Sequence, residues 1–198
     1  MTHALIVIDV QNDFCPGGAL EVPQGDEILR GINALMSEFD AVVLTQDWHP
    51  AGHSSFASSH KNNTPYEILT MRYGPQVLWP DHCIQGSIGA QFHPELQADR
   101  ADLIIRKGYN PDIDSYSAFF ENDHRTPTGL EGYLRTRGIE RLTMVGLALD
   151  FCVNFSAVDA AKLGFKVDVR EDLCRAIDLD GSLAKAREGM RAEGVTLA

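Results

Sequence analysis

The chain lacks a surplus of basic residues. Its 198 residues include 17 Lys and Arg against 28 Asp and Glu, which gives a formal net charge of −11. A nucleic-acid backbone is normally met by a basic surface, and anionic membranes likewise attract basic segments. We therefore expect neither nucleic acid nor a membrane surface as a partner.

Long apolar runs and export signals are also missing. No run approaches the roughly 18 apolar residues of a membrane span, and the N-terminal stretch MTHALIVIDVQNDF has no basic region or small-residue cleavage site. The four cysteines form no CxxC pair and are too few for a disulfide framework; they lie at positions 15, 83, 152 and 174. We expect a cytoplasmic protein with reduced thiols.

The apolar segments follow an alternating order of strands and helices. Strands are expected at 4–10, 41–47, 102–108, 141–148, 165–172 and 195–198, and helices at 25–39, 128–138, 150–164 and 182–194. This alternation is typical of an α/β fold with three layers, in which a mostly parallel six-stranded sheet has helices on both faces. The length suits one domain over 1–198.

A long region between the second and third strands, about 46–100, has no obvious elements of its own. It is rich in Pro, Gly, Ser and His, and five of the seven histidines lie between positions 49 and 93. A loop of this length in a compact domain is usually functional or disordered. Its Trp and His content favours a functional, metal-binding loop.

Chemically capable residues lie where the predicted strands end. In an open α/β sheet, ligands bind beyond the carboxyl ends of the strands. The first strand ends near Asp9, the second runs into Asp47, the third ends at Lys107, and the fourth leads into the turn before Cys152. We therefore expect these residues to share one site.

Asp47 and His49 are candidate metal ligands. Side chains two apart in an extended segment lie on the same face, and His82 is the natural third ligand. Carboxylate with imidazole suits Zn²⁺, Fe²⁺ or Mn²⁺. His53 and then His60 are weaker candidates. Alone, the Asp-x-His pattern equally fits a surface carboxylate beside a histidine bonded to backbone.

Cys152 is the candidate nucleophile. It lies in the first turn of a predicted helix, where the helix N-terminus is expected to lower the pKa of a thiol. The alternative is a buried structural cysteine, and this interpretation is kept for Cys174. Cys83 and Cys15 are more typical of packing near the site.

Asp9 and Lys107 are expected to pair, because an isolated carboxylate at the end of an apolar strand is costly to bury. The pair could be a purely structural ion pair. In the functional interpretation, Asp9 takes the proton of Cys152 and Lys107 holds the charges in place.

Taken together, these residues resemble the nicotinamidase family, within the isochorismatase-like cysteine hydrolases. The matching stretches follow the family's order from position 5 to about 161: LIVIDVQNDFCPGGAL, TQDWHPAGHSSFA, WPDHCIQGSIGAQFHP, IIRKGYNPDIDSYSAFF and VGLALDFCVNFSAVDA. The resemblance implies an isochorismatase-like, Rossmann-like fold. It also implies a catalytic triad of Asp9, Lys107 and Cys152.

The resemblance assigns further residues. Asp47, His49 and His82 match the metal ligands, and His53 matches a histidine that ligates the metal in some relatives. The Leu147–Ala148 peptide is expected to be cis, and the N–H groups of Ala148 and Cys152 would form the oxyanion hole. Three aromatics match the walls of a pyridine pocket, although core packing is the alternative for each of them: Phe14, Trp79 and Tyr116.

The resemblance implies that the chain hydrolyses nicotinamide to nicotinate and ammonia through a Cys152 thioester, in NAD salvage. The cofactor would be one divalent ion, with Zn²⁺ ahead of Fe²⁺ and Mn²⁺, and the protein a monomer or a small homo-oligomer. One alternative is a related amidase acting on a ureido or carbamoyl substrate, or an isochorismatase; such relatives generally lack the Asp-x-His and His set. The other is a non-catalytic metal-binding protein, which would not need Asp9, Lys107 and Cys152.

Overall fold

The central sheet has six strands. The computed structural model describes residues 2–198, and the strand order is β5-β2-β1-β6-β7-β8. Every neighbouring pair in it is parallel. The strands are β1 Thr2–Ile8, β2 Ala41–Asp47, β5 Leu103–Lys107, β6 Ile139–Leu147, β7 Lys166–Arg175 and β8 Thr196–Leu197. The predicted six-stranded parallel sheet is confirmed.

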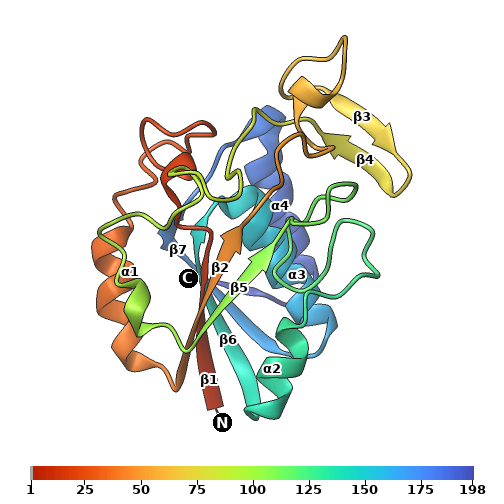
Figure 1. The fold of residues 1–198 in the computed structure, drawn as a ribbon. Helices are drawn as coiled ribbons and strands as arrows, with labels where there is room; N and C mark the ends of the chain where they lie inside the picture. Colours follow the sequence, from red (N-terminus) through yellow and green to blue (C-terminus); the bar gives the residue numbers. More distant parts are fainter. Residues whose placement is uncertain (1) are drawn as a thin grey trace.

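Helices cover both faces of this sheet, because the central strand β1 is apolar on both sides. Ala4, Ile6 and Ile8 point into one core cluster, and Leu5 and Val7 into the other. Helix α1 (Leu29–Leu35) packs on the second cluster; the first is covered by α2 (Leu130–Thr136), α3 (Asn154–Lys162) and α4 (Ser182–Ala192). Figure 1 shows these three layers and the three-helix side.

The long region between β2 and β5 was expected to have no elements of its own, and this expectation is wrong. It contains an antiparallel hairpin of β3 (Ile68–Met71) and β4 (Gly74–Val77). Figure 1 shows this hairpin beyond the carboxyl ends of the sheet strands. Each strand has four residues, too short for an alternating pattern to stand out in the sequence.

Two predicted helices begin differently from expectation. The helix expected over 25–39 is α-helical only in α1, and a 3₁₀ turn, Met36–Glu38, follows it. A Cβ on Gly25 would lie 2.7 Å from the backbone oxygen of Phe14, so the preceding turns pack closely against the loop after β1. The helix expected over 150–164 begins with a π-helical turn, Leu149–Val153, before α3.

The connection from β6 to this turn contains the expected backbone feature. The Leu147–Ala148 peptide bond is cis.

Among residues 2–198, no helix combines the length and the apolar character needed to cross a membrane.

Candidate active site

Four strand ends meet at one edge of the sheet, as predicted. Asp9 follows β1, Asp47 ends β2 and Lys107 ends β5, while Cys152 lies in the π-helical turn after β6. All four side chains are buried, and Asp9 is fully so. The parallel order of the strands therefore brings residues from distant parts of the sequence into one buried site.

The ammonium group of Lys107 is the centre of this arrangement. Its Nζ lies 2.8 Å from Oδ2 of Asp9, 3.1 Å from Oδ1 of Asp47 and 3.5 Å from Sγ of Cys152. It also donates a hydrogen bond to the carbonyl oxygen of Ser115 at 2.8 Å. The thiol and two carboxylates thus surround the ammonium group of Lys107.

The pKa values of this group follow from its burial. Burial raises the pKa of Asp9 above its ordinary value, although Lys107 opposes the effect. For Lys107, burial would lower the pKa, but Asp47 and Asp9 together raise it well above its ordinary value. Lys107 therefore stays charged, and Asp9 holds a proton more readily than an exposed carboxylate.

The expected low pKa of Cys152 is wrong for this structure. Burial raises the pKa of the Cys152 thiol well above its ordinary value; Lys107 opposes this, and Asp9 and Asp47 add to it. The prediction failed because it placed the thiol at the open start of an α-helix, whereas the side chain is only 7% exposed within the π-helical turn. The thiol therefore holds its proton more tightly than a free cysteine, and a base is needed to remove it.

Thr45 fixes the proposed base. Its Oγ1 donates a hydrogen bond to Oδ1 of Asp9 at 2.6 Å and accepts one from the Asp9 backbone N–H at 3.1 Å. Both side chains are fully buried. Thr45 was missed from the sequence, because a threonine inside a β-branched strand carries no functional signal of its own.

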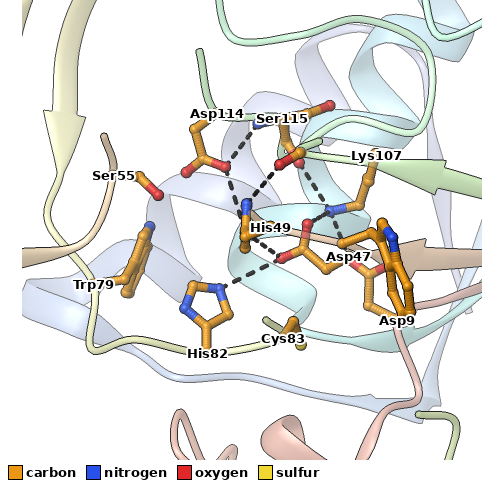
Figure 2. Close-up of polar contacts among 12 residues, drawn as sticks. Asp9, Asp47, His49, Ser55, Trp79, His82, Cys83, Lys107, Asp114 and Ser115 are labelled. Atoms are coloured by element: carbon orange, nitrogen blue, oxygen red, sulfur yellow. Dashed lines mark hydrogen bonds and ion pairs between the residues drawn. The ribbon is translucent and has the colours of Figure 1, made fainter. Parts of the chain in front are cut away.

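Asp47, His49 and His82 form a candidate metal site. Oδ2 of Asp47 lies 3.1 Å from Nε2 of His49 and 3.4 Å from Nε2 of His82 (Figure 2). Their ligand atoms all lie within 4.8 Å of one another. The sequence prediction of these three residues as one cluster therefore agrees with the geometry.

The hydrogen bonds of the two rings suit metal binding. Nδ1 of His49 bonds to the carbonyl oxygen of Gly108, and Nδ1 of His82 to that of Pro80, each at 2.8 Å. A carbonyl only accepts, so each Nδ1 carries the proton and each Nε2 of a neutral ring presents a lone pair. Two lone pairs then converge on a carboxylate oxygen, and a cation satisfies all three.

The neighbours of these ligands hold them rigidly. Gln11 bonds to both backbone groups of Asp47, accepting from its N–H at 2.7 Å and donating to its carbonyl at 2.8 Å. The ring of Phe56, which is fully buried, packs 5.4 Å from the His49 ring and 5.5 Å from the His82 ring. Neither residue was identified from the sequence.

His53 lies beside the cluster, with its ring centroid 4.4 Å from that of His49. Its Nδ1 accepts from the Ser55 N–H at 3.1 Å, and its Nε2 lies 2.7 Å from the carbonyl oxygen of Asn110. Both ring nitrogens are thus engaged by protein groups. His60, the weakest candidate, instead bonds through Nε2 to the carbonyl oxygen of Ser54.

A pocket opens between the thiol and the metal cluster. Phe14, Trp79 and Tyr116, the aromatics expected to line it, are among its walls, and Ala148 and Cys152 lie there too. The other lining residues are Leu20, Asp47, His82, Asp114, Phe151 and Ile177. These mostly apolar walls, with Cys152 and His82 among them, suit a flat aromatic ring.

Phe151 completes the aromatic wall. Its ring meets Trp79 edge to face at 4.9 Å and Tyr116 at 5.7 Å, and Trp79 Nε1 donates to the Tyr116 hydroxyl at 3.0 Å. Phe151, Leu20 and Ile177 were not selected from the sequence, because apolar residues near a site are not distinguishable there from core residues.

The chain is similar to known proteins over nearly its full length. The family described as the Isochorismatase domain matches residues 3–198. A nicotinamidase of Acinetobacter baylyi is 54% identical over 192 residues, which are 97% of this chain and 90% of that protein.

Solved structures show the same similarity. A nicotinamidase and pyrazinamidase of Acinetobacter baumannii is 55% identical and superposes with a TM-score of 0.98 over 99% of this chain and 95% of that one. A pyrazinamidase of Pyrococcus horikoshii in complex with zinc is 36% identical, with a TM-score of 0.79 over 100% and 99%. The likeness covers nearly the full length of each chain.

Proposed function

The chain belongs to the isochorismatase family, and we propose that it acts within this family as a nicotinamidase, which hydrolyses nicotinamide to nicotinate and ammonia. The observation that carries the proposal is the position of Lys107 Nζ, 3.5 Å from the Cys152 thiol and 2.8 Å from Asp9, beside the Asp47, His49 and His82 cluster. A thiol, a base and a metal site around an aromatic pocket suit a pyridine carboxamide.

The first half of the reaction forms a thioester. Asp9 takes the proton of the Cys152 thiol, and Sγ attacks the carboxamide carbon. The backbone N–H groups of Ala148 and Cys152 stabilise the oxyanion of the tetrahedral intermediate. Asp9 returns the proton to the amide nitrogen, the C–N bond breaks, and ammonia leaves.

The second half regenerates the enzyme. Asp9 takes a proton from water, whose oxygen attacks the thioester carbon, and the C–S bond breaks to release nicotinate. The Cys152 thiol recovers its proton from Asp9. Lys107 stays protonated throughout, because Asp47 and Asp9 raise its pKa well above the ordinary value, which burial alone would lower.

Asp47, His49 and His82 would hold a divalent ion, which supplies a Lewis-acidic point that orients and polarises the pyridine nitrogen. Zn²⁺ is the foremost candidate, because one carboxylate and two imidazoles suit it and the Pyrococcus horikoshii relative was solved with zinc. Fe²⁺ and Mn²⁺ accept the same ligands.

The cellular setting follows from the same proposal. The reaction belongs to NAD salvage, and all four cysteines are free, as a reducing cytoplasm requires. We expect a monomer or a small homo-oligomer, and one chain supplies every residue assigned above to the site.

An ammonia-release assay tests the function. Purified protein is given nicotinamide, a ureido substrate and a carbamoyl substrate, each with and without a chelator. We expect chelator-sensitive release from nicotinamide at a rate far above that from the other two. Faster release from a ureido or carbamoyl substrate would instead support the related-amidase alternative, and no release from any of them would contradict an amidase of either kind.

A further inference from the structure

The pocket contains a buried carboxylate that is not at a strand end and has no role in the site described above. Asp114 is 2% exposed and lines the pocket together with Cys152. Its Oδ1 lies 3.9 Å from Nε2 of His49, the nitrogen that also faces Asp47 (Figure 2). We propose that Asp114 is the second carboxylate of the metal centre and balances the charge of the cation. The proposal rests on the nicotinamidase function and deepens it.

The hydrogen bonds of Asp114 orient its carboxylate without neutralising it. Oδ1 accepts from the backbone N–H of Ser115 at 2.7 Å, and Oδ2 accepts from Nε2 of Gln76 at 2.9 Å. Among residues 2–198, His49 is the only basic side chain within ion-pair distance of Asp114, and it is charged only when its ring is protonated. Its two donors are a backbone N–H and a side-chain amide, and neither carries a charge that balances a carboxylate.

The position of Asp114 indicates what that partner is. One oxygen of Asp114, one nitrogen of His49 and one of His53 lie within 4.8 Å of one another, and His49 is shared with the Asp47 and His82 cluster. Asp114 and Asp47 therefore both face Nε2 of His49, at 3.9 Å and 3.1 Å. A cation bound at Nε2 of His49 would be near both carboxylates.

The same segment connects Asp114 to the proposed triad. The N–H of Ser115 bonds to Asp114, and the carbonyl oxygen of Ser115 accepts from Nζ of Lys107 at 2.8 Å. Ser115 therefore fixes the Asp114 carboxylate relative to the Lys107 ammonium group. The distance between the candidate metal site and the Cys152 thiol is restrained in the same way.

A count of buried charges explains why a second carboxylate is needed. With Asp9, Asp47 and Lys107 ionised and the Cys152 thiol neutral, the group has a total charge of −1. A divalent cation brings the total to +1, and Asp114 brings it to zero. Residual charge in a buried site is costly. A neutral site also suits a neutral amide and does not retain the anionic product nicotinate.

The first experiment measures metal affinity. Asp114→Asn and Asp112→Asn are stripped of metal, and the dissociation constant for Zn²⁺ is measured by competition with a chelator. Asp112 is an exposed carboxylate two residues away on the same segment and serves as the control. We expect Asp114→Asn to weaken Zn²⁺ binding about 10- to 100-fold, and Asp112→Asn to leave it unchanged.

The second experiment measures ligand charge preference. In the Zn²⁺-loaded protein, loss of Asp114 leaves the site positive, so the dissociation constant of nicotinate should fall relative to the KM of nicotinamide by about tenfold. Asp114→Glu keeps the charge and should keep the ratio near that of the wild type. The Zn²⁺ measurement does not depend on the substrate, so it stands even where the wild type fails to hydrolyse nicotinamide.

Folding is checked separately by thermal unfolding. Asparagine places an amide against the Nε2 donor of Gln76, so Asp114→Ser is measured as a second neutral variant that avoids this clash. Weaker Zn²⁺ binding and stronger relative nicotinate binding in a folded neutral variant support the proposal. Unchanged Zn²⁺ affinity in a folded neutral variant overturns it and leaves Asp114 as a structural residue that orients Ser115.

Discussion

Lys107 Nζ lies 3.1 Å from Oδ1 of Asp47, and this contact joins the two halves of the site. The other oxygen of the same carboxylate faces the two imidazoles. His49 in its protonated form, together with Lys107, holds the pKa of Asp47 well below its usual range, even though burial opposes them. The structure therefore favours the carboxylate form of Asp47, which lies between the ammonium group beside the thiol and the proposed metal.

Cys152→Ala should abolish ammonia release from nicotinamide, with a loss of at least about a thousandfold, because no other thiol lines the pocket. Zn²⁺ content should stay unchanged, since Sγ is not one of the clustered ligand atoms. A coupled ammonia assay and elemental analysis measure the two quantities. Cys174→Ala is the control, because Cys174 is buried away from the pocket and should be dispensable for turnover. Retained turnover in Cys152→Ala would remove the nucleophile assignment.

His49→Ala should strip the metal, because it removes a ligand that belongs to both candidate clusters. Elemental analysis after gel filtration should show a large drop in bound Zn²⁺, and ammonia release should fall with it. The matched control is His93→Ala, which removes a partly buried imidazole outside the clusters. Undiminished metal in His49→Ala, or equal losses in both variants, would count against the site.

The sequence predicts the central residues of the site because the ends of the strands can be located from the apolar runs. Asp9, Asp47, Lys107 and Cys152 each follow an apolar run, and parallel strands place their carboxyl ends together. Asp114 has no such signal. It lies in the irregular stretch between β5 and α2, and its place in the pocket depends on Gln76, a long-range partner that no local pattern reveals.

The errors have equally local causes. The low pKa expected for Cys152 came from its place near a helix start, but burial raises this pKa, Lys107 opposes the rise, and Asp9 and Asp47 add to it. The helix expected over 25–39 is shortened because its first residues pack in turns against the backbone near Phe14. Tertiary contacts decide both outcomes, and a single sequence shows periodicity without showing contacts.

Thr45→Val should shift the pH dependence of the reaction. Burial raises the pKa of Asp9, so the active carboxylate is lost as the pH falls through a value above the ordinary one. The Thr45 hydroxyl stabilises the carboxylate and lowers that pKa, so its removal should move the acidic limb of kcat/KM upward by about one pH unit. Rates from pH 4 to 9 measure the shift.

The control for this prediction is Thr143→Val, which removes a buried threonine hydroxyl that bonds to Nε2 of His3 at 2.9 Å and not to the site. Its acidic limb should coincide with that of the wild type. An acidic limb that stays in place in Thr45→Val, or moves downward, would contradict the role of Asp9 as the base.

Alkylation should distinguish the cysteines by access. Burial raises the pKa of Cys174 to about 12, and it also raises that of Cys152 well above its ordinary value, so thiolate content alone does not favour Cys152. Only Cys152 lines the pocket, so a limiting dose of iodoacetamide should modify it first. Saturating nicotinate should slow this labelling, because the product fills the same pocket. Peptide mass spectrometry measures both, and equal labelling of the two thiols, or no protection by nicotinate, would place the reactive thiol outside the pocket.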